Sequence, residues 1–128
     1  MKKLSGVVVS QRRVAKCLAD RLLGHFGDKI EAIVLYGSVA RGEAERESDI
    51  DLLIIVPEGE IRKQVLSLSY YVDLEFGTVT SHVHMNSKEF ERYVNLGDPF
   101  LKDVLKEGII LYDRGFYSRV RESLFKQG

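Results

Sequence analysis

The chain has 128 residues, 45% of them hydrophobic and 30% charged, which predicts a single domain, residues 1–128, that buries a core without disulfides. Nineteen lysines and arginines balance nineteen aspartates and glutamates, and this zero net charge argues against a long nucleic acid as a partner. Cys17 is the only cysteine, which excludes an intramolecular disulfide, and apolar runs such as Leu52 to Val56 are too short to span a membrane, so we expect a cytoplasmic protein without a membrane partner.

The first predicted element is an amphipathic helix from about Val8 to Phe26. Its apolar residues recur at three- and four-residue spacing, which is typical of a helix that buries one face. Arg12 and Arg13 fall on the opposite, polar face. Gly27 ends the helix.

Two apolar strands follow, Glu31 to Tyr36 and Asp49 to Val56, joined by a polar connector of eleven residues, Ser38 to Ser48. The connector carries Gly42 and many charges, and we expect a turn of helix and a surface loop there. It is short for a helical crossover between parallel neighbours, which favours a mixed sheet. The second strand is apolar on both faces beyond its polar start, which predicts a central strand covered on both sides.

The second strand opens with two carboxylates, Asp49 and Asp51. Side chains alternate along a strand, so both point the same way, with Cα atoms roughly 6.6 Å apart at about 3.3 Å of rise per residue. Like charges at this separation repel unless a cation lies between them, and oxygen ligands suit a hard divalent ion. Asp49 and Asp51 are therefore the candidate catalytic residues and ligands of Mg²⁺ or Mn²⁺.

The first strand ends in Gly37-Ser38, where a phosphate could approach the backbone because glycine has no Cβ. Ser38 offers an N–H and a hydroxyl at the start of a short helix. A phosphate here and a metal at the two aspartates would orient a nucleoside triphosphate for attack on its α-phosphorus, which predicts nucleotidyl transfer. Arg41 is a further candidate nucleotide ligand, since guanidinium matches phosphate geometry; the alternative is a solvated loop of mixed charges.

Gly-Ser, ten residues and then Asp-x-Asp, with strands on both sides, resembles the signature of the DNA polymerase β-like nucleotidyltransferases. The short chain is similar to their minimal nucleotidyltransferases. The resemblance covers Ile33 to Val56, and the rest of the chain matches more loosely. It implies an α/β fold of the α+β type, in which flanking helices pack on a small mixed β-sheet like the polymerase β palm.

The same resemblance implies transfer of a nucleotide, most plausibly AMP from ATP, to an acceptor hydroxyl with Mg²⁺ or Mn²⁺. Many minimal nucleotidyltransferases resemble the antitoxin half of HEPN toxin pairs, so the expected acceptor is a tyrosine of a HEPN-type partner protein. Whether the chain forms a homo-oligomer stays open.

A helix over Glu60 to Glu75 and a third strand over Thr78 to Met85 come next. Active members of the family usually carry a third carboxylate on this strand, facing the first two, and this strand has none. His82 or His84 could take that position, because imidazole acts as a base near neutral pH; two exposed histidines on an edge strand are the alternative. The departure favours a second hypothesis, a weak or inactive nucleotide- and metal-binding module that acts by binding a partner protein.

Asn86 can cap a short helix through about Val94, with Glu89 as its reciprocal partner. The remaining predicted elements are a helix that starts at Asp98-Pro99 and ends at Gly108, a strand over Ile109 to Tyr112, and a final helix with the apolar stripe Phe116, Val120 and Leu124.

Overall fold

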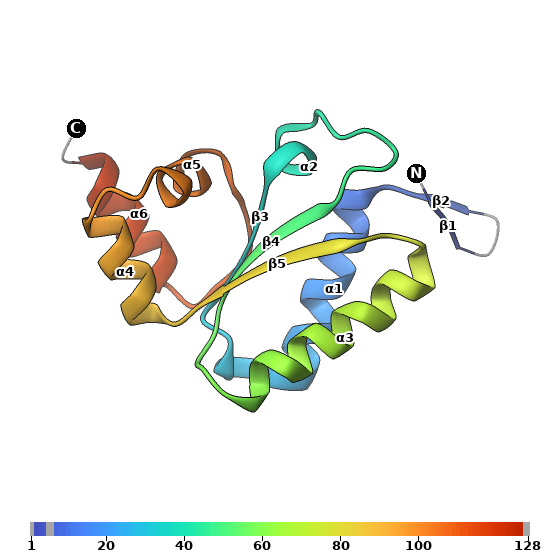
Figure 1. Cartoon of the computed structure of the whole chain (residues 1–128), viewed down its shortest axis with the longest axis horizontal. Coiled ribbons are helices and arrows are strands. Elements are labelled where there is room, and N and C mark those ends of the chain that lie inside the picture. The colour runs from blue at the N-terminus through green and yellow to red at the C-terminus, as the bar shows by residue number, and fades with distance from the viewer. Residues whose placement is uncertain (1, 5–6, 127–128) are drawn as a thin grey trace.

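A four-stranded sheet with helices on both faces forms the centre of the computed structural model, which describes residues 2–4 and 7–126 (Figure 1). Its elements in chain order are β1 (Lys2–Leu4), β2 (Val7–Val9), α1 (Gln11–Phe26), the 3₁₀ turn η1 (Gly27–Lys29), β3 (Ala32–Tyr36), α2 (Gly37–Arg41), β4 (Ile50–Ile55), α3 (Glu60–Phe76), β5 (Thr80–Met85), α4 (Ser87–Asn95), α5 (Pro99–Glu107), β6 (Ile109–Asp113) and α6 (Phe116–Lys126).

The sheet is mixed, as predicted, with strand order β5-β4-β3-β6. β3 runs antiparallel to both β4 and β6, whereas β4 and β5 are parallel. The short connector after β3 allows only the antiparallel pairing of β3 with β4, and the long helix α3 supplies the crossover that the parallel pair needs. The second predicted strand is therefore central, between β3 and β5.

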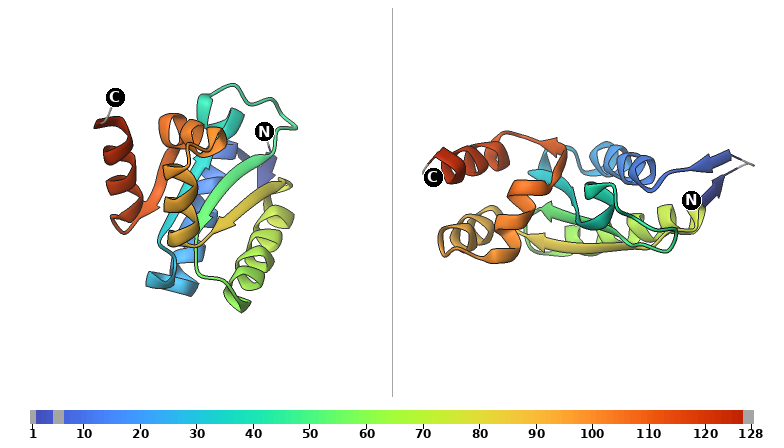
Figure 2. Two further views of the ribbon diagram at one scale, coloured as in Figure 1. Left: turned by 60° about the vertical axis from the view of Figure 1, so that its left-hand side comes forward. Right: turned by 90° about the horizontal axis from the view of Figure 1, so that it is seen from above.

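The helices form two layers, one on each face of the sheet (Figures 1 and 2). Ile50, Leu52 and Ile54 of β4 are fully buried against α1 and α3. Leu53 and Ile55 are equally buried on the other face, which α4, α5 and α6 cover. Burial of both faces explains the uninterrupted apolar sequence of β4. Side chains alternate along a strand, so every second residue from Leu53 in β4 also points toward the α4–α6 layer.

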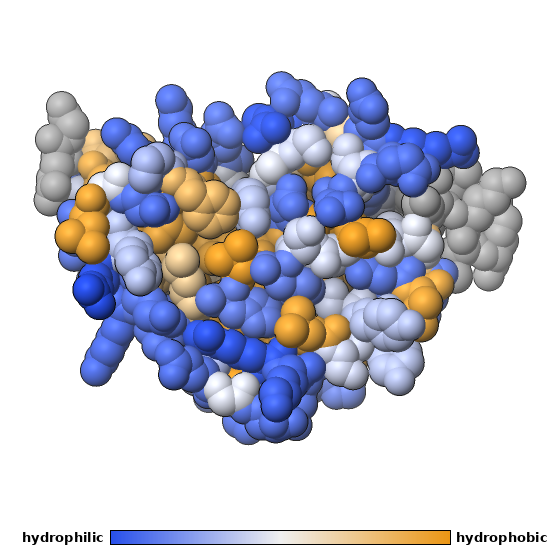
Figure 3. Space-filling view, in the orientation of Figure 1, coloured by the Kyte–Doolittle hydropathy of each residue, from blue (hydrophilic) through white to orange (hydrophobic). Residues whose placement is uncertain are grey.

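The surface carries an apolar area over α4 and α5 (Figure 3). Leu96, in the turn between these helices, is 70% exposed, and Phe100 of α5 is 38% exposed. Within the described part of the chain, every helix is too short or too polar to cross a membrane.

The N-terminal segment differs from the prediction, because the first helix begins at Gln11 and not at Val8. Val7–Val9 pair antiparallel with Lys2–Leu4 as a two-stranded ribbon. Ser10 is extended and its Oγ accepts a hydrogen bond from the Arg13 N–H at 3.3 Å, so it caps the helix. The sequence between the two strands, Ser5-Gly6, is typical of a turn. The strands are only three residues long, however, and Val7 to Val9 also fit the apolar spacing of a helix.

The third strand begins at Thr80, two residues later than predicted. Asp73 of α3 holds the preceding turn, since its carboxylate accepts hydrogen bonds from the Thr78 hydroxyl at 2.6 Å and from the Thr80 N–H at 3.0 Å. Gly77 ends α3 in the left-handed conformation. Asp73 is thus a structural residue of the α3–β5 turn.

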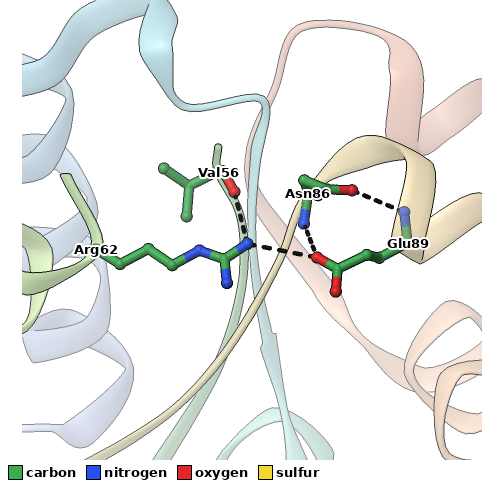
Figure 4. Close-up of polar contacts among 4 residues, drawn as sticks. All are labelled: Val56, Arg62, Asn86 and Glu89. Atoms are coloured by element: carbon green, nitrogen blue, oxygen red, sulfur yellow. Dashed lines mark hydrogen bonds and ion pairs between the residues drawn. The ribbon is translucent and has the colours of Figure 1, made fainter. Parts of the chain in front are cut away.

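The start of α4 is a capping box, as predicted (Figure 4). Asn86 Oδ1 accepts from the Glu89 N–H at 2.8 Å, and the Asn86 N–H donates to Glu89 Oε1 at 3.0 Å. Arg62 of α3 donates from Nη2 to the Val56 carbonyl at 3.2 Å and lies 3.5 Å from Glu89 Oε1. One cluster therefore joins the end of β4 to the starts of α3 and α4.

We expect Asn86→Ala to lower the free energy of unfolding by about 1 kcal/mol, because it leaves the Glu89 N–H without its cap. Urea denaturation at pH 7 measures the change. Lys88→Ala, at an exposed position of the same turn, serves as the control. Equal stability of the two variants would contradict a stabilising capping box.

Candidate active site

The end of β3 and the start of β4 meet at one edge of the sheet. Tyr36 pairs with Asp51 in the antiparallel register, so Gly37, the first residue of α2, lies against the Asp51 side chain. A Cβ on Gly37 would collide with Asp51 Oδ2 and lie 3.1 Å from its Cγ. Gly37 also has a φ of +74°, which disfavours any other residue. The position needs glycine both for its backbone conformation and for the close approach of the carboxylate.

The connector begins with the short helix that its sequence predicts. Ser38 lies in the only full turn of α2, which ends at Gly42 in the left-handed conformation. The Ser38 carbonyl accepts from the Glu43 N–H at 2.9 Å. Its hydroxyl has no hydrogen-bond partner among residues 2–4 and 7–126, so it is free to take a ligand there.

The two aspartates flank the start of β4. Asp49 is exposed immediately before the strand, and Asp51 is half-buried on the face of Leu53. Burial raises the pKa of Asp51, the nearby Asp49 carboxylate raises it further, and Arg41 opposes the shift. The negative charge of Asp51 is therefore less favourable in the folded protein than in the unfolded chain.

This electrostatic conflict fits a divalent cation, whose charge would relieve it and whose preferred ligands are oxygens. Among the described residues, no group of three or more His, Cys, Asp or Glu side chains is arranged to hold a metal ion. Asp49 and Asp51 could supply two carboxylate ligands to such an ion, and its other ligand oxygens would then come from the nucleotide or from water.

Arg41 lies beside this edge, with its guanidinium already paired. Its Nε donates to Glu43 Oε1 at 2.8 Å, and its Nη1 is 3.7 Å from Glu107 Oε2. The hydrogen bond that Arg41 donates to Glu43 raises the pKa of Arg41, and the charges of Glu43, Glu107 and Asp51 add to the shift. A phosphate would have to compete with these carboxylates for the guanidinium.

A pocket of about 230 Å³ adjoins Gly37 on the side of α5. Tyr36 packs edge-to-face on Phe100, with ring centroids 5.2 Å apart. Burial raises the pKa of the Tyr36 phenol, and Asp51 raises it further. The full lining is Tyr36, Gly37, Arg41, Phe100, Asp103, Val104 and Glu107.

Ser81 of β5 faces the two aspartates where a third carboxylate was expected. It pairs with Asp51 in the parallel register, and its hydroxyl donates to Asp49 Oδ2 at 3.1 Å. Neither His82 nor His84, the two candidates from the sequence, takes this position, because they pair with Leu52 and Ile54 and lie on the face of the sheet that α3 covers. Sequence reasoning missed Ser81, since only the strand register identifies the residue opposite Asp51.

The two histidines form a partly buried hydrogen-bonded chain with a serine of α3. His82 Nε2 lies 2.7 Å from Ser69 Oγ, and His82 Nδ1 lies 3.2 Å from His84 Nε2. Burial lowers the pKa of both histidines to about 4, and His82 and Arg62 further oppose a charge on His84. Both side chains are thus neutral packing residues behind the sheet.

We expect the free energy of unfolding to decrease as the pH falls from about 6.5 toward about 4. The folded pKa values lie below the unfolded value of 6.5, so the unfolded chain binds more protons in this window. The pair should contribute on the order of 2 kcal/mol, a value that allows for the partial exposure of both rings.

Urea denaturation of the wild type and of His82→Asn/His84→Gln across this range tests the expectation. The double variant should show a shallower pH dependence, whereas His25→Gln, at an exposed position of α1, should match the wild type. Identical pH profiles for the wild type and the double variant would contradict the assignment.

Sequence reasoning also placed Arg12 on the polar face of the first helix, without a partner. Its guanidinium instead reaches α2, where it donates to the carbonyls of Val39 and Ala40. An isolated arginine at a helix start carries no sequence signal for such a distant contact.

Comparison with known proteins agrees with this geometry. The family model described as polymerase beta, nucleotidyltransferase, matches residues 21–116. A protein of Methanocaldococcus jannaschii named as a protein adenylyltransferase is 30% identical over 105 residues, which cover 81% of this chain and 100% of that protein. A second protein so named in the same organism is 29% identical over 112 residues, covering 86% and 98% of the two chains.

Solved structures share the fold. A chain of a toxin–antitoxin complex with AMP-PNP superposes with a TM-score of 0.57 at 16% identity, covering 88% of this chain and 85% of that one. A chain from the complex of a tri-AMPylated Shewanella oneidensis HEPN toxin with its MNT antitoxin gives a TM-score of 0.50 at 14% identity, covering 91% and 88%. The family match over residues 21–116 and the full-length similarity to the M. jannaschii protein show that the chain belongs to the polymerase beta nucleotidyltransferase family, which confirms the predicted mixed α/β fold and transferase class.

Proposed function

We propose that this chain transfers AMP from ATP to a hydroxyl group of a partner protein, and that the acceptor is a tyrosine of a HEPN-type protein. The observation that carries the proposal is the contact between Gly37 and Asp51. It brings a turn suited to phosphate within reach of the carboxylates suited to a metal. Nucleotidyl transfer needs this juxtaposition, because the triphosphate must be held and its charge neutralised at one place.

Each site residue has a role in this proposal. Asp49 and Asp51 hold Mg²⁺ or Mn²⁺, and the bound ion would neutralise charge on the reacting phosphates. Gly37 and Ser38 bind the distal phosphates through backbone N–H groups and the free Ser38 hydroxyl. Arg41 exchanges its carboxylate partners for phosphate oxygens, which match its planar donors.

Several observations support a protein acceptor. Two relatives are named as protein adenylyltransferases, and the fold resembles that of a chain from a complex whose HEPN toxin is AMPylated. Phe100 of α5 lines the pocket beside Gly37, and Leu96, four residues earlier in the chain, is 70% exposed. Exposed apolar surface next to a site suits a macromolecular substrate better than a small one.

Ser81 favours a second candidate, a nucleotide- and metal-binding module that acts by occluding its partner. A serine hydroxyl cannot deprotonate the acceptor as a carboxylate does, and here it donates to Asp49. For transfer, the partner protein or the triphosphate itself would have to accept the proton.

Incubation with α-³²P-labelled ATP, Mg²⁺ or Mn²⁺ and the protein encoded by the adjacent reading frame distinguishes the two candidates. Denaturing electrophoresis would detect label on the partner if AMP is transferred. A complex with the partner that forms normally but carries no label with any nucleoside triphosphate would overturn transfer and favour the binding module.

A further inference from the structure

Two neighbouring residues at the start of α1 hold both ends of the connector between the candidate phosphate and metal ligands. Arg12 donates from Nε to the Val39 carbonyl at 3.0 Å and from Nη2 to the Ala40 carbonyl at 2.7 Å. Gln11 donates from Nε2 to the Ser48 carbonyl at 2.7 Å and to the Glu45 carbonyl at 3.3 Å. Four hydrogen bonds therefore run from one helical turn to a segment about thirty residues away in sequence.

Arg12 acts on α2, which is too short to be stable alone. A five-residue helix leaves most of its carbonyls without partners inside the helix, and nucleation of a single turn is unfavourable. The Glu43 N–H donates to the Ser38 carbonyl, and the Gly42 N–H donates to the Val39 carbonyl. The Arg12 guanidinium donates a second hydrogen bond to Val39 and one to Ala40. Its positive charge also lies at the helix end that carries negative partial charge.

Gln11 acts on the other end of the connector. The Ser48 carbonyl that it binds immediately precedes Asp49. Between α2 and β4 the described backbone has only turns and irregular structure, with the Glu45 N–H bonded to Ser48 Oγ at 2.9 Å. The side chain of Gln11 thus fixes the backbone from which Asp49 extends.

α1 is a rigid base for both contacts. Val14, Ala15 and Leu18 in its first turns are buried against the sheet, and Ser10 caps its start. Because Gln11 and Arg12 are adjacent on this anchored helix, they fix the position of α2 relative to Asp49. A site that joins a phosphate to a metal depends on that distance, since small displacements of reacting groups cost large factors in rate.

We propose that Gln11 and Arg12 are positioning residues of the nucleotidyl-transfer site: Arg12 sets the phosphate-binding turn of α2, and Gln11 sets the metal-binding segment before β4. This assignment rests on the proposed function above. It predicts separate effects, because Arg12 acts on nucleotide binding and Gln11 on metal binding.

We expect Arg12→Ala to raise the KM for ATP about tenfold with a smaller change in kcat, and Gln11→Ala to raise the Mn²⁺ concentration for half-maximal ATP-analogue binding about tenfold. Arg12→Lys keeps the charge but cannot bind both carbonyls in a fork, so it should rescue only part of the loss. Arg13→Ala is the matched control, since Arg13 is the exposed neighbour and its side chain has no hydrogen bond or ion pair within residues 2–4 and 7–126.

Hydrogen exchange of the ligand-free protein separates this proposal from the proposed function. Amides of residues 38–48 should exchange faster in Arg12→Ala and Gln11→Ala than in Arg13→Ala, with the rest of the sheet unchanged. If the wild type neither binds nor transfers the nucleotide, the proposed function fails, whatever the exchange data show. If the wild type is active but KM, metal dependence and exchange in the two variants match Arg13→Ala, the positioning role is overturned.

Discussion

Asp51→Asn should reduce AMP transfer about 1,000-fold or more and at the same time slightly stabilise the protein without nucleotide or metal. The loss of transfer follows because the amide removes the negative charge that holds the cation and leaves one carboxylate, Asp49. The gain in stability follows from the folded-state electrostatics of this position.

The sign of the stability effect comes from the raised pKa of Asp51. Burial and the Asp49 charge place it above the value in the unfolded chain, so the folded protein binds the proton more tightly. Ionisation at neutral pH therefore destabilises the fold, and this penalty grows as pH rises through the acidic range. A neutral amide removes it, so the variant should melt at a slightly higher temperature at pH 7.

Thermal unfolding with and without Mn²⁺ and an ATP analogue, beside the labelled transfer assay, measures both effects. The ligands should raise the melting temperature of the wild type and not that of the variant. Asp20→Asn, which removes an exposed carboxylate of α1, is the control. A fully active Asp51→Asn protein would exclude Asp51 as a catalytic metal ligand.

Gly37→Ala should both destabilise the protein and abolish transfer. The positive φ of 74° alone costs roughly 1–2 kcal/mol for a residue with a Cβ. The new Cβ would also displace the Asp51 carboxylate, because its oxygen and Cγ occupy that space. The two halves of the site would be forced apart by one methyl group.

A double-mutant cycle separates strain from collision. In the Asp51→Ala background the carboxylate oxygen and Cγ are absent, so Gly37→Ala should lower the free energy of unfolding only through the strain of its positive φ. The effects of the two substitutions on the free energy of unfolding should therefore not be additive. Urea denaturation of all four proteins gives the coupling free energy. Additive effects would mean that Asp51 does not lie against Gly37.

Gly24→Ala provides the control for this cycle. Gly24 lies inside α1, and an added Cβ there would have no atom within 4 Å. Alanine is the better helix former, so this variant should be more stable by about 0.5–1 kcal/mol and fully active.

Much of the fold could be predicted because local patterns and tertiary packing agree. β4 is apolar on both faces and is central, and Asn86 with Glu89 forms the predicted capping box. The β1–β2 ribbon was missed although Ser5-Gly6 is a turn dipeptide, because its strands have only three residues each and Val7 to Val9 continue the apolar spacing of the first helix. The exact start of β5 depends on the hydrogen bonds that the Asp73 carboxylate accepts, and these contacts produce no periodic pattern in the sequence.

The candidate site could be predicted where it lies in one stretch of sequence. Gly37, Ser38, Asp49 and Asp51 are close along the chain, and alternation along a strand places both aspartates on one side. Ser81 is contributed by another strand, so its position opposite Asp51 requires the register of β4 with β5.

The most direct test of the central claim is the binding of a non-hydrolysable ATP analogue with Mn²⁺, measured by isothermal titration calorimetry, because it needs no partner protein. We predict that the wild type binds the analogue only with the metal, that Ser38→Ala binds it more weakly, and that Asp49→Asn/Asp51→Asn does not bind it. Unchanged binding by the double variant, or binding by the wild type that is indifferent to the metal, would contradict a nucleotide and metal site at the Gly37–Asp51 junction.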